Sequence, residues 1–229
     1  MPTDKTLKTI QAISGLTFAM FSTIHLGGHL LSNISFRAAD TALFINRELF
    51  WRSPLWEFTT IGGSLIIHSI TGYWRLSLRK PESKSSTTTP LLERKIYERH
   101  LHRYSGYFLS IAMFGHITAT RLLPLFKLPD ASIVDLTMVT KTLVDLPIIF
   151  YPYYFLLGST GIYHSCYGIV SALKTFDLFS SFTDIKAGNW SRFGIVIGLV
   201  MMSTVVALGG WYESIDIPMD YIYDQLFTF

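Results

Sequence analysis

Five long apolar segments alternate with polar connections along the chain. They cover approximately residues 10–34, 55–76, 104–123, 148–173 and 193–211. Each is close to the roughly 20 residues that a helix needs to cross a bilayer. Because the lipid interior offers the backbone no hydrogen-bond partners, we expect these segments to be helical throughout. The pattern therefore predicts an all-α polytopic membrane bundle of five transmembrane helices.

The first four segments read as two copies of one unit. The stretch GGSLIIHSITG at 62–72 recurs as GSTGIYHSCYG at 158–168. In both copies a glycine stands six residues before a histidine, a serine follows that histidine, and another glycine comes four residues after it. The residues of this pattern are His68 with Gly62 and Gly72, and His164 with Gly158 and Gly168. We expect a duplicated two-helix unit followed by a fifth helix.

A second sequence pair supports the duplication. Gly15, after a serine, precedes His25 by ten residues, and Gly106, also after a serine, precedes His116 by ten. The expected organisation is a first membrane repeat at 1–79, a cytosolic linker at 80–103, a second repeat at 104–176, and a fifth span with its tail at 177–229. Within the linker, KPESKSSTTTP has too little apolar surface to fold alone.

The two connections within the repeats differ in character. Residues 35–53 mix charged side chains with aromatic and aliphatic ones, at spacings suited to a helix lying in the membrane interface. Residues 126–145 are also mixed and can hold a short interfacial helix. In the last segment, Gly194 and Gly198 form a small-xxx-small face of the kind that lets membrane helices pack closely.

The composition agrees with a membrane protein. Hydrophobic residues make up 49% of the chain and charged residues 15%, whereas an ordinary soluble domain has about 25% charged residues. The single cysteine, Cys166, excludes an intramolecular disulfide. The net charge is only +3 and no basic run is dense, so nucleic acid is not an expected partner.

Charge also predicts an orientation. With five spans, 13 of the 19 lysines and arginines lie on the side that holds the N-terminus, and 6 lie on the other. By the positive-inside tendency, the N-terminus and the linker face the cytosol.

Four histidines fall into two pairs by depth. His25 and His116 come late in spans that run away from the cytosolic side, so they share one level. His68 and His164 come late in spans that run the opposite way, so they share another level. An imidazole on each side of a flat macrocycle is the geometry of bis-histidine haem b. The pairs therefore predict haem b at His68 and His164, and a second haem is a further hypothesis at His25 and His116.

The glycines and the remaining histidines refine this hypothesis. Gly62, Gly72, Gly158 and Gly168 remove side chains where a porphyrin has to approach the backbone. His29 lies one turn from His25 and is an alternative ligand to it. His100 and His102 are interpreted as loop residues in contact with solvent or headgroups. In the competing interpretation, the intramembrane histidines are hydrogen-bonding residues between helices, with Ser69 and Ser165 as neighbours.

Two motifs resemble the cytochrome b anchor subunits of succinate dehydrogenase. The run from His102 to Gly106, HRYSG, resembles the His-Arg-x-Ser-Gly signature that opens a membrane helix in that family. HSITG at 68–72, followed by Arg75, and HSCYG at 164–168 resemble its haem-ligand helix. The resemblance implies haem b at His68 and His164, and quinone proximity for Arg103 and Ser105.

The chain as a whole resembles a fungal family of mitochondrial outer-membrane proteins. Members of that family compensate, when overexpressed, for loss of the mitochondrial distribution and morphology machinery. The resemblance implies an outer-membrane location, a role in lipid homeostasis, and recruitment of a bridge-like lipid-transfer protein. Recruitment in the family uses a Pro-x-Pro motif in an N-terminal tail, and no Pro-x-Pro occurs in this sequence.

Two function classes remain open. One is a non-catalytic outer-membrane factor in lipid homeostasis and organelle contact that holds haem b. The other is a haem b redox cytochrome, or a quinone-linked anchor subunit that passes electrons for a partner. The sequence has no flavin, nicotinamide or iron–sulfur motif, which favours the first class.

Overall fold

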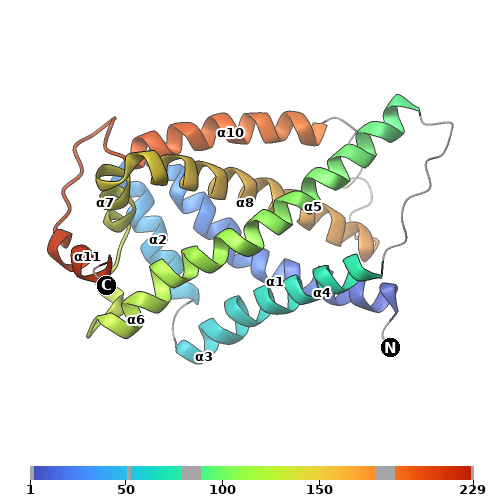
Figure 1. Cartoon of the computed structure of the whole chain (residues 1–229), viewed down its shortest axis with the longest axis horizontal. Helices are drawn as coiled ribbons and strands as arrows, with labels where there is room; N and C mark the ends of the chain where they lie inside the picture. The colour runs from blue at the N-terminus through green and yellow to red at the C-terminus, as the bar shows by residue number, and fades with distance from the viewer. Residues whose placement is uncertain (1–2, 51–52, 79–88, 179–188, 228–229) are drawn as a thin grey trace.

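The computed structural model describes residues 3–50, 53–78, 89–178 and 189–227, which form helices and connecting turns without a strand (Figure 1). The long helices are α1 (Asp4–Leu30), α4 (Gly63–Ser77), α5 (Pro90–Ile117), α8 (Pro147–Thr175) and α10 (Asn189–Leu208). The shorter ones are α2 (Phe36–Phe50), α3 (Pro54–Glu57), α6 (Leu123–Lys127), α7 (Thr137–Asp145) and α11 (Asp220–Phe227). Single turns of 3₁₀-helix lie at Leu31–Asn33 and Ala131–Ile133.

Two of the long helices begin at caps that are visible in the sequence. The Thr3 hydroxyl accepts a hydrogen bond from the backbone N–H of Thr6, at 3.3 Å. The Thr89 hydroxyl does the same for the N–H of Leu92, at 3.4 Å, and Pro90 occupies the first turn of α5. A threonine cap satisfies one N–H group of the first turn, and proline has no N–H to leave unpaired there.

Two helices are lengthened by π-helical turns. The turn Phe58–Gly62 joins α3 to α4, and the turn Thr118–Leu122 joins α5 to α6. The helical stretches are therefore continuous over residues 54–77 and 90–127. A π-turn inserts an extra residue into the helical ladder and re-aims the side chains around it.

Three of the described helical stretches are long and apolar enough to cross a membrane. They are Asp4–Asn33, Pro90–Lys127 and Asn189–Leu208. The stretches at 54–77 and 147–175 coincide with the other two expected spans, but they are not among these three. All five run along the long axis of the molecule, with α1 and α8 at the centre (Figure 1). Helix α1 packs against α4 and α8, and α8 packs against α5 and α10.

The bundle is apolar outside and partly polar inside, as expected for a membrane protein. On its surface, Ile111 is 77% exposed, Phe114 74% and Leu199 70%. Side chains that a soluble protein would leave in water, such as Ser22, Thr71 and Thr204, are buried instead. Lipid solvates apolar side chains, so a surface of this kind is stable in a bilayer and an aggregation hazard in water.

The polar connections are largely helical, as expected for residues 35–53 and 126–145. The predicted interfacial segment forms α2, which buries Ala39 and Asn46. The connection at 126–145 contains α6 and α7. The charged segment 91–103 belongs to α5 and is helical throughout. Of the predicted linker at 80–103, residues 80–88 lie outside the described residues.

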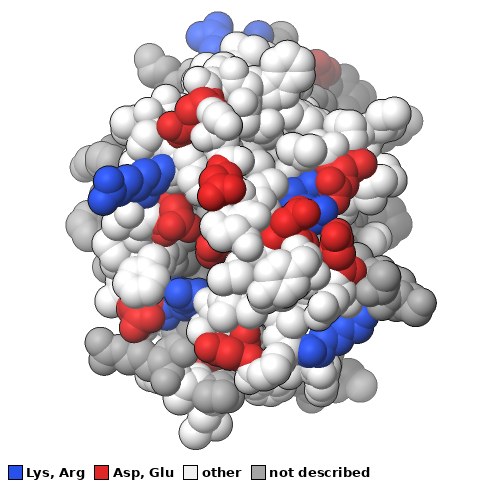
Figure 2. Space-filling view, turned by 90° about the vertical axis from the view of Figure 1, so that its left-hand side faces the viewer, with Lys and Arg blue, Asp and Glu red and all other residues white. Residues whose placement is uncertain are grey.

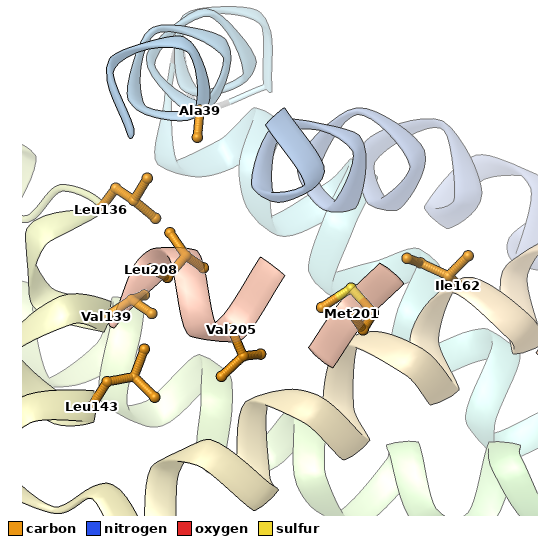
Figure 3. Close-up of a cluster of buried hydrophobic side chains, with 8 residues drawn as sticks. All are labelled: Ala39, Leu136, Val139, Leu143, Ile162, Met201, Val205 and Leu208. Carbon is orange, nitrogen blue, oxygen red and sulfur yellow. The ribbon is translucent and has the colours of Figure 1, made fainter. Parts of the chain in front are cut away.

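Helices α2, α7, α8 and α10 share an apolar core at one end of the bundle (Figure 3). Its buried members are Ala39, Leu136, Val139, Leu143, Ile162, Met201, Val205 and Leu208. The side chains come from both repeats and from the last long helix, so their burial holds the connections against the membrane helices.

The C-terminal helix α11 is fixed at the same end. Tyr223 and Leu226 are fully buried, and the Tyr223 hydroxyl donates to Asp135 Oδ1 at 3.0 Å. Lys141 on α7 forms ion pairs with Asp145, Asp220 and Asp224 at 2.8, 2.8 and 3.0 Å. The hydrogen bonds that Lys141 donates to these carboxylates raise its pKa above the usual value, so it stays charged. Acidic side chains gather on this end of the molecule (Figure 2).

Replacing Tyr223 with alanine should release α11. The change removes a fully buried aromatic side chain, so we expect it to weaken the docking by about 3–5 kcal/mol. Hydrogen exchange of residues 220–227 measures the effect. Tyr221→Ala on the same helix is the control, because Tyr221 is 63% exposed. Equal protection of α11 in both variants would contradict the packing described.

Candidate haem site between paired histidines

His68 on α4 and His164 on α8 face each other inside the bundle. Their ring centroids lie 6.2 Å apart, with the ring planes at 87°. The two residues come from corresponding positions of the two sequence repeats, and neither helix packs beside the other along its length. The sequence-based expectation that they share one level is consistent with this distance.

Each ring is held through its Nδ1 atom by a backbone carbonyl of another helix. His68 Nδ1 lies 3.0 Å from the Gln11 oxygen on α1, and His164 Nδ1 lies 3.1 Å from the His102 oxygen on α5. A carbonyl can only accept, so Nδ1 carries the proton in both rings. Nε2 is then the unprotonated nitrogen, which is the state in which imidazole binds a metal.

The two carbonyls occupy corresponding positions. Gln11 is four residues before Gly15, and His102 is four residues before Gly106. Ser105 adds a contact in the second repeat, because its hydroxyl lies 2.9 Å from His164 Nδ1 and donates to the His102 oxygen at 2.7 Å. In both halves of the chain, a backbone carbonyl four residues before a glycine therefore contacts Nδ1 of the histidine.

Gly15 and Gly106 make room for the two rings. A Cβ atom at Gly15 would lie 2.8 Å from His68 Nδ1, and one at Gly106 would lie 2.9 Å from His164 Cε1. Such distances are shorter than van der Waals contact, so any larger residue would displace the imidazole. The sequence repeat places these glycines ten residues before His25 and His116, but it does not show that they contact the rings of His68 and His164.

The glycines expected at the haem have other neighbours. A Cβ at Gly72 would lie 2.9 Å from Gln11 Nε2, and one at Gly168 would lie 3.6 Å from His102 Nε2. Both thus border residues that anchor the ligand histidines. Gly158 instead packs against Met201 of α10, and a Cβ at Gly62 would meet nothing within 4 Å. Gly158 therefore serves helix packing, and Gly62 faces open space.

The expectation that His102 is a solvated loop residue is wrong. It lies on α5, and its ring stacks on His164 with centroids 4.3 Å apart and planes at 7°. On its other side Tyr167 stacks at 4.4 Å. The ring is buried because α5 continues as a helix through the polar segment and turns this residue towards α8. Its Nε2 atom is buried and has no hydrogen-bond partner among the described residues.

Arg103 and Ser105, the residues for which quinone proximity was expected, lie on the same turns of α5. Ser105 is buried and directed at His164, so its observed contact is with the imidazole. Arg103 is half-buried beside His102. In the first repeat, Arg75 donates to the Gln11 side chain at 2.7 Å and pairs with Asp4 at 2.9 Å. It therefore steadies the residue whose carbonyl holds His68.

The second histidine pair is also brought together. His25 on α1 and His116 on α5 have ring centroids 6.2 Å apart. His29 lies 4.8 Å from His25, and Phe21 stacks on His25 at 5.2 Å. Within the described part of the chain, neither His25 nor His116 has the backbone anchor that fixes the other pair. The first pair is therefore the better-ordered candidate.

The geometry at His68 and His164 fits two axial ligands on one iron. With metal–imidazole bonds of about 2 Å, the ring centres on opposite sides of one metal lie about 6 Å apart. The described residues contain no cluster of three or more His, Cys, Asp or Glu side chains that could hold a bare metal ion. A metal with four equatorial ligands of its own, as in haem, needs only two.

A bidentate ion pair joins the two halves near the acidic end. Arg121, in the π-turn after α5, donates from Nε to Glu57 Oε1 at 2.6 Å and from Nη2 to Glu57 Oε2. Glu57 ends α3, immediately before the other π-turn. Each side chain is 17% exposed. The pair connects α3–α4 with α5–α6, the helices that carry His68 and His116.

Comparisons with known proteins find a match for part of the chain. No curated protein and no solved structure matches the chain. Residues 111–214 match a family model described as the transmembrane domain of MDM10-complementing protein 1. The match covers the end of α5 and all of α6, α7, α8 and α10, and it includes His116 and His164. The chain is thus a membrane protein of which residues 111–214 are similar to that transmembrane domain.

Proposed function

We propose that the chain is a multi-pass protein of the mitochondrial outer membrane that holds haem b between His68 and His164. Its five spans comprise a duplicated two-helix unit and a fifth helix. Its role is non-catalytic, in lipid homeostasis at contacts where a bridge-like lipid-transfer protein meets the organelle. The observation that carries the haem proposal is the matched pair of Nδ1 anchors, Gln11 for His68 and His102 for His164.

The mitochondrial part of the proposal is supported by the matched transmembrane domain, whose name refers to MDM10 complementation. The orientation is supported by the charge of the two ends. The described start of α5 carries Arg94, Lys95, Arg99 and Arg103, whereas acidic side chains gather at the end that holds α11 (Figure 2). A cytosolic N-terminus places the basic end in the cytosol.

When bound, haem b would supply one-electron redox chemistry. His68 on α4 and His164 on α8 would hold it through their imidazoles, and the carbonyls of Gln11 and His102 set the tautomers of these two rings. His25 and His116 are the proposed ligands of a second haem.

Fractionation and spectroscopy test the proposal together. The protein should be found with the mitochondrial outer membrane, and protease added to intact mitochondria should cut within residues 80–90. A reduced-minus-oxidised spectrum of that fraction should show a b-type signal that scales with expression of the chain. Location in another membrane, or cleavage only after membrane rupture, would refute the proposed location or orientation.

A steric block should remove haem without touching a ligand. Gly106→Leu places a side chain where His164 Cε1 lies, so we expect loss of most of the low-spin signal. Gly115→Leu on the same helix is the matched control, because a Cβ there meets nothing within 4 Å. The absorption spectrum of each purified variant measures the effect. Equal haem content in both variants would contradict the proposed position of the His164 ring.

A further inference from the structure

Helix α5 reaches beyond the apolar thickness of a bilayer. The continuous stretch Pro90–Lys127 has 38 residues, which at 1.5 Å per residue is about 57 Å. The hydrocarbon core is only about 30 Å thick. The turns from Pro90 to about Arg103 carry Arg94, Lys95 and Arg99, which the hydrocarbon core would exclude, so we place these turns at the level of the lipid headgroups.

An apolar groove follows one face of these turns. Its volume is about 570 Å³, and it is lined by Glu93, Ile96, Tyr97, His100, Leu101 and Tyr104. These positions are spaced by one, three or four residues and form one stripe along the helix. Tyr97 is 60% exposed and Tyr104 is 62% exposed. All six positions lie on α5, so the groove is an open strip along one face of that helix.

A second, basic pocket adjoins this groove. It has a volume of about 300 Å³ and is lined by Arg94, Tyr97, Ser191 and Arg192, so it lies between α5 and the start of α10. Tyr97 lines both pockets. Neither arginine forms an ion pair with another described residue. Two guanidinium groups from two helices thus face a small space beside an apolar groove.

A buried tyrosine of α8 packs against the start of α10. Tyr163 on α8 is 5% exposed, and its ring packs edge-to-face on Trp190 at 6.3 Å, one residue before Ser191. Its hydroxyl has no hydrogen-bond partner within the described part of the chain. The side chains around the start of α10 therefore include an unmatched polar group as well as the two arginines.

This combination matches one ligand chemistry. A guanidinium group presents a planar fork of donors that suits the oxygens of a phosphate. Basic pockets between membrane helices at the headgroup level bind phosphate-bearing headgroups. The adjoining groove offers apolar and aromatic surface to an acyl chain. A molecule with a phosphate directly beside an apolar tail would fill both pockets, whereas free phosphate would fill only one.

We propose that the basic pocket and the apolar groove form one phospholipid-binding site, with the phosphate held by Arg94 and Arg192 and an acyl chain lying along the stripe beyond Tyr97. The site is separate from the paired histidines and does not depend on haem. It gives the proposed role in lipid homeostasis a ligand and a place on the molecule.

Titration of the purified chain in detergent with dioleoyl phosphatidic acid, followed by native mass spectrometry, tests this site. Arg94→Gln combined with Arg192→Gln should lower the affinity at least about tenfold, since two charge-assisted contacts are lost. Lys95→Gln is the matched control, because Lys95 is an exposed basic residue on α5 that lines neither pocket. It should change the affinity less than about twofold. The haem spectra of these variants should be unchanged, so a loss of lipid binding can be told apart from a failure of the haem proposal.

Two outcomes would overturn the phospholipid site. If Lys95→Gln weakens binding as much as the double variant, the lipid responds to general charge and no defined site exists. The second concerns the source of the phosphate. Tyr104→Ala, at a position that lines the groove alone, should weaken phosphatidic acid binding and leave the binding of inorganic phosphate unchanged. Equal affinity for both ligands, together with no effect of Tyr104→Ala, would indicate a site for free phosphate.

Discussion

Replacing either His68 or His164 with alanine should abolish the same haem. Both rings lie on one iron in the proposed arrangement, so loss of either ligand converts a low-spin centre to high spin or releases the macrocycle. The Soret band and the ferric electron paramagnetic resonance signal measure this change. We expect the two variants to have matching spectra, which is the signature of a shared site.

His100→Ala is the control for this experiment. His100 is a histidine of α5 that lies outside both facing pairs, so its replacement should leave the spectrum unchanged. A second haem would appear as a signal that is lost in His25→Ala or His116→Ala and retained in His68→Ala. A normal low-spin spectrum in either His68→Ala or His164→Ala would contradict the shared ligation.

Breaking the ion pair between Arg121 and Glu57 should destabilise the bundle strongly. Both side chains are largely buried, so Arg121→Ala leaves a carboxylate without its partner, at a cost of about 3–5 kcal/mol. Denaturant unfolding of the purified protein in detergent measures this loss. Arg37→Ala should change stability by no more than about 0.5 kcal/mol, because Arg37 is exposed on α2.

A double variant separates the loss of the ion pair from the cost of leaving the Glu57 carboxylate charged and unpaired. Glu57→Gln with Arg121→Gln removes both charges, so it should be more stable than Arg121→Ala alone. If Arg121→Ala unfolds like Arg37→Ala, the pair does not hold the two halves together.

The paired histidines were predictable from the sequence because their position depends on repeat symmetry and helix direction. His68 and His164 occupy equivalent places in two spans that run in the same direction, and a rise of 1.5 Å per residue is enough to bring them to one level. The residues that anchor the two rings could not be predicted in the same way. Gln11 and His102 act through their carbonyl oxygens, which every residue has, so no residue type marks them.

His102 shows why helix length matters for such predictions. The charged residues around it favoured a loop, but lipid-spanning helices often continue into the headgroup region, and α5 does so from Pro90. Once the helix is continuous, His102 falls three residues before Ser105 and faces α8 with it. Local polarity predicted the solvent exposure wrongly because tertiary packing determined which side of the helix was buried.

Gly15 and Gly106 are a related case. Their spacing to other histidines was visible, but the rings that they admit belong to His68 and His164, which are distant in sequence. Contacts of this kind depend on how helices cross, and one sequence carries no direct record of that. Gly158 is the opposite case. Its position, repeated six residues before a histidine, predicted that it lies near the haem, but a Cβ there would meet Met201.

The haem content of the purified wild-type chain is the most direct test of the central proposal. The protein should be expressed with an adequate haem supply, and its haem b should be quantified as the pyridine haemochrome. We expect at least one haem b per chain, low-spin in the ferric state, because His68 and His164 supply two imidazoles to one iron. A folded, monodisperse protein with no Soret absorption would contradict the proposal, and the histidines would then act as hydrogen-bonding residues between helices.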